Sequence, residues 1–130
     1  MVLRQEDRRL TAYHEAGHAI VMQLLDGERD PVEKVSIIPR KRSLGVTTSV
    51  PEFDRYNYSE DLLRNRVAIA MGGRVAEKLK YNNRLTSGAS NDIEQATQTA
   101  NMMVRRLGMS KLGSVAYEDG QHSQCDLKPV

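Results

Sequence analysis

Two histidines four residues apart, His14 and His18, constrain this chain more than any other feature, and Glu15 directly follows the first of them. Residues four apart on an α-helix project from the same side, so two imidazoles at this spacing can grip one metal ion. The pattern H-E-x-x-H is typical of zinc-binding helices, and catalytic zinc has three protein ligands and one open position for water. On this interpretation Glu15 removes a proton from the bound water as a general base.

The surrounding residues predict that both histidines face the protein interior. At about 100° per residue, Leu10 and Val21 lie on the same stripe of a helix over residues 6–25 as His14 and His18. The alternative is a pair of core histidines that bond to backbone carbonyls. Two inward histidines at this spacing, with a glutamate between them, favour the metal site over that alternative.

Composition is that of an ordinary single globular domain of 130 residues, with 39% hydrophobic and 28% charged residues. A net charge of +2 and the lack of tryptophan argue against a nucleic-acid partner. No apolar run approaches the ~20 residues of a membrane-spanning helix. The single cysteine, Cys125, and an N-terminus without the apolar core of a signal peptide predict a soluble protein in a reducing compartment, either the cytoplasm or an organelle matrix or stroma.

The remaining patterns predict a mainly α-helical fold with one small β-hairpin. Runs of β-branched residues indicate the two strands, and capping residues and glycines mark the ends of the later helices. In chain order, we expect a helix over residues 6–25, strands over 35–38 and 45–49, a helix from the N-cap Ser59 to about residue 79, and a helix that starts near Ser90 or Asn91 and stops at Gly108.

Gly72 and Gly73 lie inside the second long helix, where each costs about 1 kcal/mol relative to alanine. One interpretation is that another backbone packs closely there, with the histidine helix across Gly17 as the candidate. The alternative is a kink or break in the helix at this point.

Spacing alone leaves the third metal ligand open. A metzincin needs glycine and histidine where this chain has Val21 and Leu24, so that class is excluded. The remaining histidine, His122, lies in a polar tail that we expect to be solvated. Glu77 and Asp92 remain as candidates, one on each downstream helix.

Several sequence blocks resemble the peptidase domain of the FtsH family of ATP-dependent zinc metalloproteases, and they occur in the family's order. These blocks are residues 11–19, 35–40 with 44–47, 71–77, 86–97, and 107–110 with 112–113. The resemblance implies a zincin-like helical metallopeptidase domain over residues 1–115, shorter at its C-terminal end than in the family. A tail, which can be disordered, follows over residues 116–130.

The resemblance also implies the roles of individual residues. It assigns one Zn²⁺ per chain to His14, His18 and Asp92, and it makes Glu15 the general base. The implied activity is a metalloendopeptidase that hydrolyses peptide bonds of unfolded or extended polypeptides.

A further implication concerns the second strand. In the family, the corresponding strand edge holds the substrate peptide in extended form, and strand addition of this kind reads backbone rather than side chains. The implied substrate-binding residues are Gly45, Val46, Thr47 and Thr48.

The chain also departs from the family pattern. Family members carry an AAA+ ATPase module, are usually membrane-anchored and form hexamers, whereas this chain has no G-x-x-x-x-G-K-[ST] phosphate loop, so we expect no ATP site in it. The alternative function is a non-catalytic FtsH-like fragment or stand-alone relative that binds peptides or partner subunits. Glu15 favours the enzyme, because a binding module does not need that carboxylate.

Overall fold

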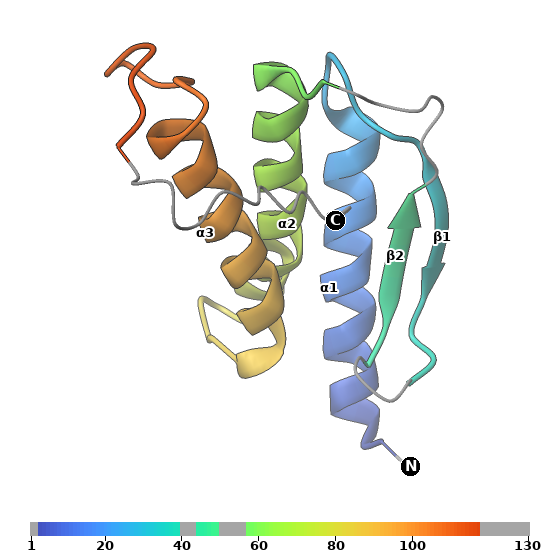
Figure 1. The fold of residues 1–130 in the computed structure, drawn as a ribbon. Coiled ribbons are helices and arrows are strands. Elements are labelled where there is room, and N and C mark those ends of the chain that lie inside the picture. The colour runs from blue at the N-terminus through green and yellow to red at the C-terminus, as the bar shows by residue number, and fades with distance from the viewer. Residues whose placement is uncertain (1–2, 40–43, 50–56, 118–130) are drawn as a thin grey trace.

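Three α-helices and one β-hairpin lie side by side in the computed structural model, which describes residues 3–39, 44–49 and 57–117. Figure 1 shows α1 between the hairpin on one side and α2 on the other, with α3 packed against α2. The predicted class, mainly helical with a small hairpin, is confirmed. The elements are α1 (Gln5–Leu24), β1 (Val32–Ser36), β2 (Val46–Ser49), α2 (Glu60–Lys80), the 3-10 helix η1 (Ser87–Ala89) and α3 (Ser90–Arg105).

Helix α1 begins and ends within one residue of the predicted range. Its buried positions include Thr11, His14, Gly17, His18 and Met22, which follow the helical repeat and face the rest of the protein. His14 is 8% exposed and His18 is 5% exposed, so the predicted inward orientation of both histidines is confirmed.

The first strand of the hairpin lies earlier in the sequence than predicted, whereas β2 falls within the predicted residues 45–49. Strands β1 and β2 pair antiparallel, with Val35 opposite Thr47 and Ser36 opposite Val46. Because Ser36 pairs with the first residue of β2, residues 37 and 38 follow the strand instead of forming it. The prediction of a first strand over residues 35–38 is therefore wrong by about three residues at its start: β-branched content marked this region, but the register with β2 decides which residues pair.

Glycines on α1 and α2 bring the two backbones into contact. Helix α2 runs without interruption through Gly72 and Gly73, so the predicted close packing is confirmed and the kink or break is wrong. A Cβ on Gly17 would overlap the carbonyl oxygen of Gly72, and one on Gly72 would lie 2.8 Å from the carbonyl oxygen of Gly17. A Cβ on Gly73 would lie 2.5 Å from Cε1 of His14 and 2.7 Å from Nε2 of His18.

The start of α2 follows the prediction. The backbone N–H of Leu62 donates to Oγ of Ser59 at 3.1 Å, as expected for an N-cap serine. Glu60 and Asp61 lie in the first turn, where their charges complement the positive end of the helix.

Helix α3 starts at Ser90, as predicted, but the residue that caps it differs from the expectation. Neither Ser90 nor Asn91 is the N-cap: Ala89 holds that position, because η1 leads directly into α3. The side chain that caps this segment is that of Thr86, the N-cap of η1, whose hydroxyl accepts from the backbone N–H of Gly88. Helix α3 ends at Arg105, and the chain turns at Gly108, whose φ of 64° suits glycine.

Among the described residues, no helix combines the length and the apolar character needed to cross a membrane. Residues 118–130, which make up most of the predicted tail and include His122, lie outside the described residues.

Replacing Gly17 with alanine tests the contact between α1 and α2. At an open helical position this change stabilises by about 1 kcal/mol, but here the methyl group would meet Gly72 and lie 2.7 Å from Cβ of Ala76. We expect the free energy of unfolding, measured by urea denaturation, to fall by about 1–3 kcal/mol, as in other overpacked cores. Gln23→Ala, at an exposed position of the same helix, is the control. A more stable Gly17→Ala variant would contradict the close contact.

Candidate metal centre

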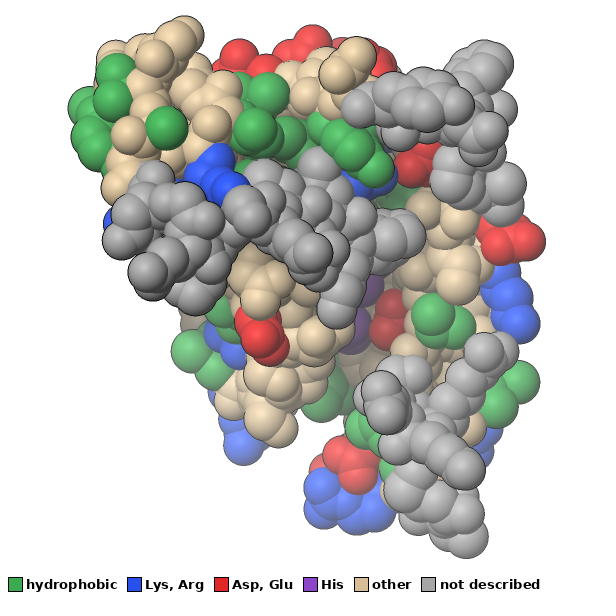
Figure 2. All heavy atoms as spheres, in the orientation of Figure 1, with side chains coloured by type: hydrophobic (Ala, Val, Ile, Leu, Met, Phe, Trp, Pro, Cys, Tyr) green, Lys and Arg blue, Asp and Glu red, His purple; other side chains and the backbone are tan. Residues whose placement is uncertain are grey.

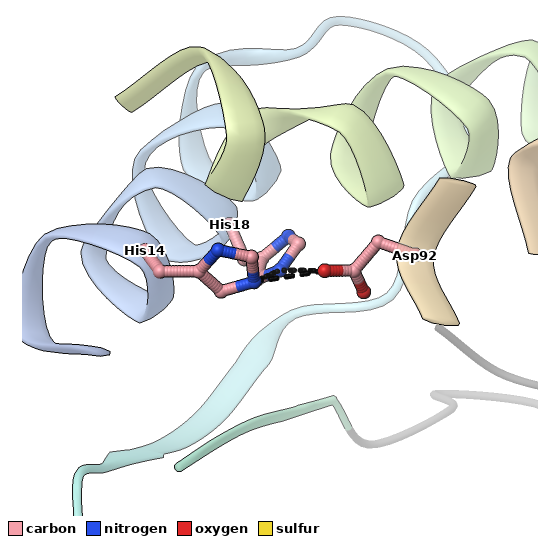
Figure 3. Close-up of side chains that lie close together, drawn as sticks. All are labelled: His14, His18 and Asp92. Atoms are coloured by element: carbon pink, nitrogen blue, oxygen red, sulfur yellow. Dashed lines mark hydrogen bonds and ion pairs between the residues drawn. The ribbon is translucent and has the colours of Figure 1, made fainter. Parts of the chain in front are cut away.

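Three polar side chains from α1 and the first turn of α3 converge on one point (Figure 3). Oδ2 of Asp92 lies 2.8 Å from Nε2 of His14 and 3.2 Å from Nε2 of His18. The two Nε2 atoms are 3.0 Å apart. The structure therefore brings together the two predicted histidines and one of the two candidate carboxylates, with their nearest atoms all within 4.8 Å of one another.

The second ring nitrogen of each histidine faces a hydrogen-bond acceptor. Nδ1 of His18 donates to the backbone carbonyl of Ile69 at 2.6 Å, and Nδ1 of His14 lies 3.1 Å from Oε2 of Glu77. A carbonyl only accepts, so Nδ1 of His18 carries a proton, and an ionised Glu77 requires the same of His14. In the neutral rings, both Nε2 lone pairs then point at one another and at the carboxylate of Asp92.

This arrangement of acceptors fits a bound cation. Three lone-pair donors at such short distances repel one another unless a proton or a metal ion lies among them. Two imidazole nitrogens and one carboxylate oxygen form a ligand set that zinc accepts, whereas magnesium and calcium prefer oxygen ligands throughout. The chemistry of the cluster therefore fits the zinc ion that the sequence pattern predicts.

Glu77, the other candidate ligand, lies on the far side of His14 from the cluster. Its side chain is 1% exposed, and its two oxygens contact Nδ1 of His14 and the hydroxyl of Thr86, the latter at 2.8 Å. Such a contact fixes the ring orientation and tautomer of a ligating histidine. The sequence contains no signal for this pairing, because His14 and Glu77 are 63 residues apart.

Glu15 lies beside the cluster and contacts the hairpin. It is 8% exposed, and its Oε1 lies 2.8 Å from the hydroxyl of Thr47, which also lies 3.0 Å from the Glu15 backbone carbonyl. Gly45 permits this close approach, because a Cβ there would lie 3.0 Å from Cγ of Glu15 and 2.6 Å from Cγ2 of Thr11. The side chain of Thr47 thus forms a hydrogen bond with Glu15, the predicted general base.

A pocket of about 420 Å³ opens in front of these residues. Figure 2 shows histidine and acidic side chains at the base of a hollow in the surface. Gly45, Val46 and Thr47 of the predicted substrate segment line the pocket, and Asn91 and Gln95 of α3 line it as well. Thr48 is not among its lining residues; its hydroxyl lies 3.3 Å from the carboxylate of Glu33.

The cluster shifts the pKa values of its members. Burial disfavours a charged His14, but hydrogen bonds with Asp92 and Glu77 outweigh burial and raise its pKa to about 8. Burial likewise opposes charge on His18, whose bonds with Asp92 and Ile69 raise its pKa. Burial would raise the pKa of Asp92, but its bonds with the two histidines lower it to about 2. The raised pKa of His14 therefore favours its protonated form at pH 7.

Comparison with known proteins shows the family to which this chain is similar. Residues 1–129 match the family model for peptidase family M41. The chain is 49% identical over 132 residues to the ATP-dependent zinc metalloprotease FtsH of Thermobaculum terrenum, covering all of this chain and 20% of that protein. It is 51% identical over 121 residues to the protein of the same name from Magnetococcus marinus, covering 92% of this chain and 18% of that protein. The chain thus spans about a fifth of the length of these curated relatives.

Alanine at Asp92 and at Glu77 should affect zinc binding to different extents. Asp92→Ala removes a carboxylate that lies among the Nε2 atoms, whereas Glu77→Ala removes only the partner of Nδ1. We expect Glu77→Ala to weaken zinc by about 10–100-fold, as is typical for residues that orient a ligand, and Asp92→Ala to weaken it far more. Competitive chelator titration gives both affinities, and the reverse order would show that Glu77 is the ligand.

Zinc affinity should fall as the pH falls below about 8. The proton on His14, whose pKa is about 8, must leave before the nitrogen can bind a metal. Below that pKa, this group alone should cost about tenfold in affinity per pH unit. Chelator competition between about pH 6 and 8.5 measures the slope, and an affinity that does not change over this range would contradict a protonated His14.

Proposed function

Because the chain belongs to peptidase family M41, we propose that it is the proteolytic domain of a zinc-dependent endopeptidase in which His14, His18 and Asp92 bind one Zn²⁺. The observation that carries this proposal is the meeting of two Nε2 atoms and one carboxylate oxygen at the base of a pocket. When bound, zinc polarises the scissile carbonyl and lowers the pKa of a water molecule to roughly 7.

Glu15 is the proposed proton carrier. It follows His14 in the sequence and lines the same pocket. The hydroxyl of Thr47 donates to Oε1 of Glu15. We therefore propose that the second carboxylate oxygen of Glu15 accepts the proton of the attacking water. The carboxyl group then returns this proton to the leaving amine, which lets one residue act as base and acid in turn.

The proposed peptide-binding element is Gly45 together with the edge of β2 that follows it, over Val46, Thr47 and Thr48. Among the described residues, β2 pairs only with β1, so its other edge has backbone groups for an added strand. Such an edge binds extended polypeptide through its backbone, with little selection among side chains. Asn91 and Gln95 place neutral amide groups in the same pocket, which also suits a peptide backbone.

An ATPase is the proposed partner that delivers substrate. The relatives are named ATP-dependent, and this chain corresponds to about a fifth of their length. We propose that an AAA+ module, in a hexamer of the family type, supplies unfolded polypeptide to this domain in a reducing compartment. Residues 1–115 are the proposed peptidase domain, and residues 116–130 are the proposed tail.

Glu15→Gln tests the catalytic assignment. The amide has nearly the size of the carboxylate and can still accept from Thr47, so the fold and zinc binding should persist. Loss of a general base typically costs about 10²–10⁴-fold in rate, so we expect cleavage of an unfolded protein such as casein to fall by that factor. The assay compares the two proteins at equal zinc content, fused to an ATPase module if the isolated chain is slow.

The control is Glu33→Gln, at an exposed carboxylate on β1. Unchanged cleavage in Glu15→Gln would show that Glu15 is not the base. Cleavage lost from both variants would point to damage to the hairpin instead.

A further inference from the structure

Thr86 lies between α2 and α3, and its polar atoms contact both sides of this connection. Its hydroxyl donates to Oε1 of Glu77 at 2.8 Å and accepts from the N–H of Gly88 at 3.2 Å. Its carbonyl accepts from Nη2 of Arg74 at 3.0 Å. Thr86 therefore forms two hydrogen bonds with α2 and one with η1.

The contact with Glu77 has a consequence for His14. Because Glu77 is 1% exposed, a carboxylate oxygen without a partner there would be costly. One oxygen is satisfied by Thr86 and the other by Nδ1 of His14. The carboxylate is planar, so the bond with Thr86 fixes its rotation and keeps Oε2 directed at His14.

The contact with Gly88 has a consequence for Asp92. Gly88 belongs to η1, which leads directly into α3, and Asp92 follows it by four residues in the first turn of that helix. The Thr86 hydroxyl satisfies an N–H at the start of this segment that has no intrahelical partner. Thr86 thereby fixes the position from which α3 delivers the Asp92 carboxylate.

We propose that Thr86 is a positioning residue of the metal centre, whose hydroxyl orients His14 through Glu77 and places Asp92 through η1. The proposal rests on the proposed zinc site but adds a residue outside the ligand set. Its role depends on the hydroxyl group, because this one oxygen both donates to Glu77 and accepts from Gly88. The methyl group of Thr86 contributes to neither bond.

Thr86→Val and Thr86→Ser separate the hydroxyl from the shape of the side chain. Valine keeps the branched shape without the hydroxyl, and serine keeps the hydroxyl. With folding checked by circular dichroism, we expect chelator competition to show zinc binding weakened about 10–100-fold in Thr86→Val and within about threefold of the unmodified chain in Thr86→Ser. Ser87→Ala, at the exposed neighbouring hydroxyl, is the control and should bind zinc normally.

A double-mutant cycle tests whether Thr86 acts through Glu77. In a Glu77→Ala background there is no carboxylate to orient, so Thr86→Val should weaken zinc binding less than it does alone. If the effects of Thr86→Val and Glu77→Ala on the free energy of zinc binding were fully additive, Thr86 would not act through Glu77. If Thr86→Val does not fold, Thr86→Ala replaces it in both comparisons, because alanine also lacks the hydroxyl.

Two further outcomes overturn the proposal. One is normal zinc affinity in Thr86→Val, and the other is a loss in Thr86→Ser as large as that in Thr86→Val. Failure of the unmodified chain to bind zinc would instead contradict the proposed function, so the two failures are distinguishable.

Discussion

The contact between the backbones of α1 and α2 is the constraint on which the rest of the structure depends. Gly17 and Gly72 lie so close that neither position has room for a side chain. Gly73 then leaves space for the two imidazoles, which would otherwise collide with its Cβ. Three glycines inside helices cost stability locally, yet they let α1 approach α2 closely enough to bury His14 and His18.

Burial at this contact determines the electrostatics of the site. Polar groups inside a protein require partners, and here each histidine has an acceptor at Nδ1, supplied by α2 in both cases. This leaves the Nε2 atoms facing the carboxylate of Asp92 at the base of the pocket. Burial disfavours a charged His14, but its hydrogen bonds with Asp92 and Glu77 outweigh burial and raise its pKa to about 8. The same packing that forms the core thus prepares a site for a cation.

Local sequence patterns predicted the features that depend on neighbours along the chain. The helical repeat predicted α1 and the inward direction of both histidines, and Ser59 predicted the start of α2. The predictions were wrong where contacts between residues on separate elements determine the bounds or the cap of an element. The register with β2 moved the first strand toward the N-terminus, and η1 made Ala89, instead of Ser90 or Asn91, the N-cap of α3.

The choice between Asp92 and Glu77 shows the same limit. Both carboxylates lie on helices downstream of the histidines, and spacing gave no reason to prefer either. Packing places Asp92 beside Nε2 of His14 and Glu77 beside Nδ1 of the same ring. The hydroxyls of Thr47 and Thr86, which contact Glu15 and Glu77, could not be predicted, because no local pattern pairs residues across separate elements.

Anomalous diffraction at the zinc edge, from crystals of the chain grown with zinc, tests the central claim most directly. The account predicts one peak per chain, about 2.0–2.2 Å from Nε2 of His14, Nε2 of His18 and a carboxylate oxygen of Asp92. Glu77 should still contact Nδ1 of His14 in the same crystals. A zinc ion bound by Glu77, or no peak beside the two histidines, would contradict the account.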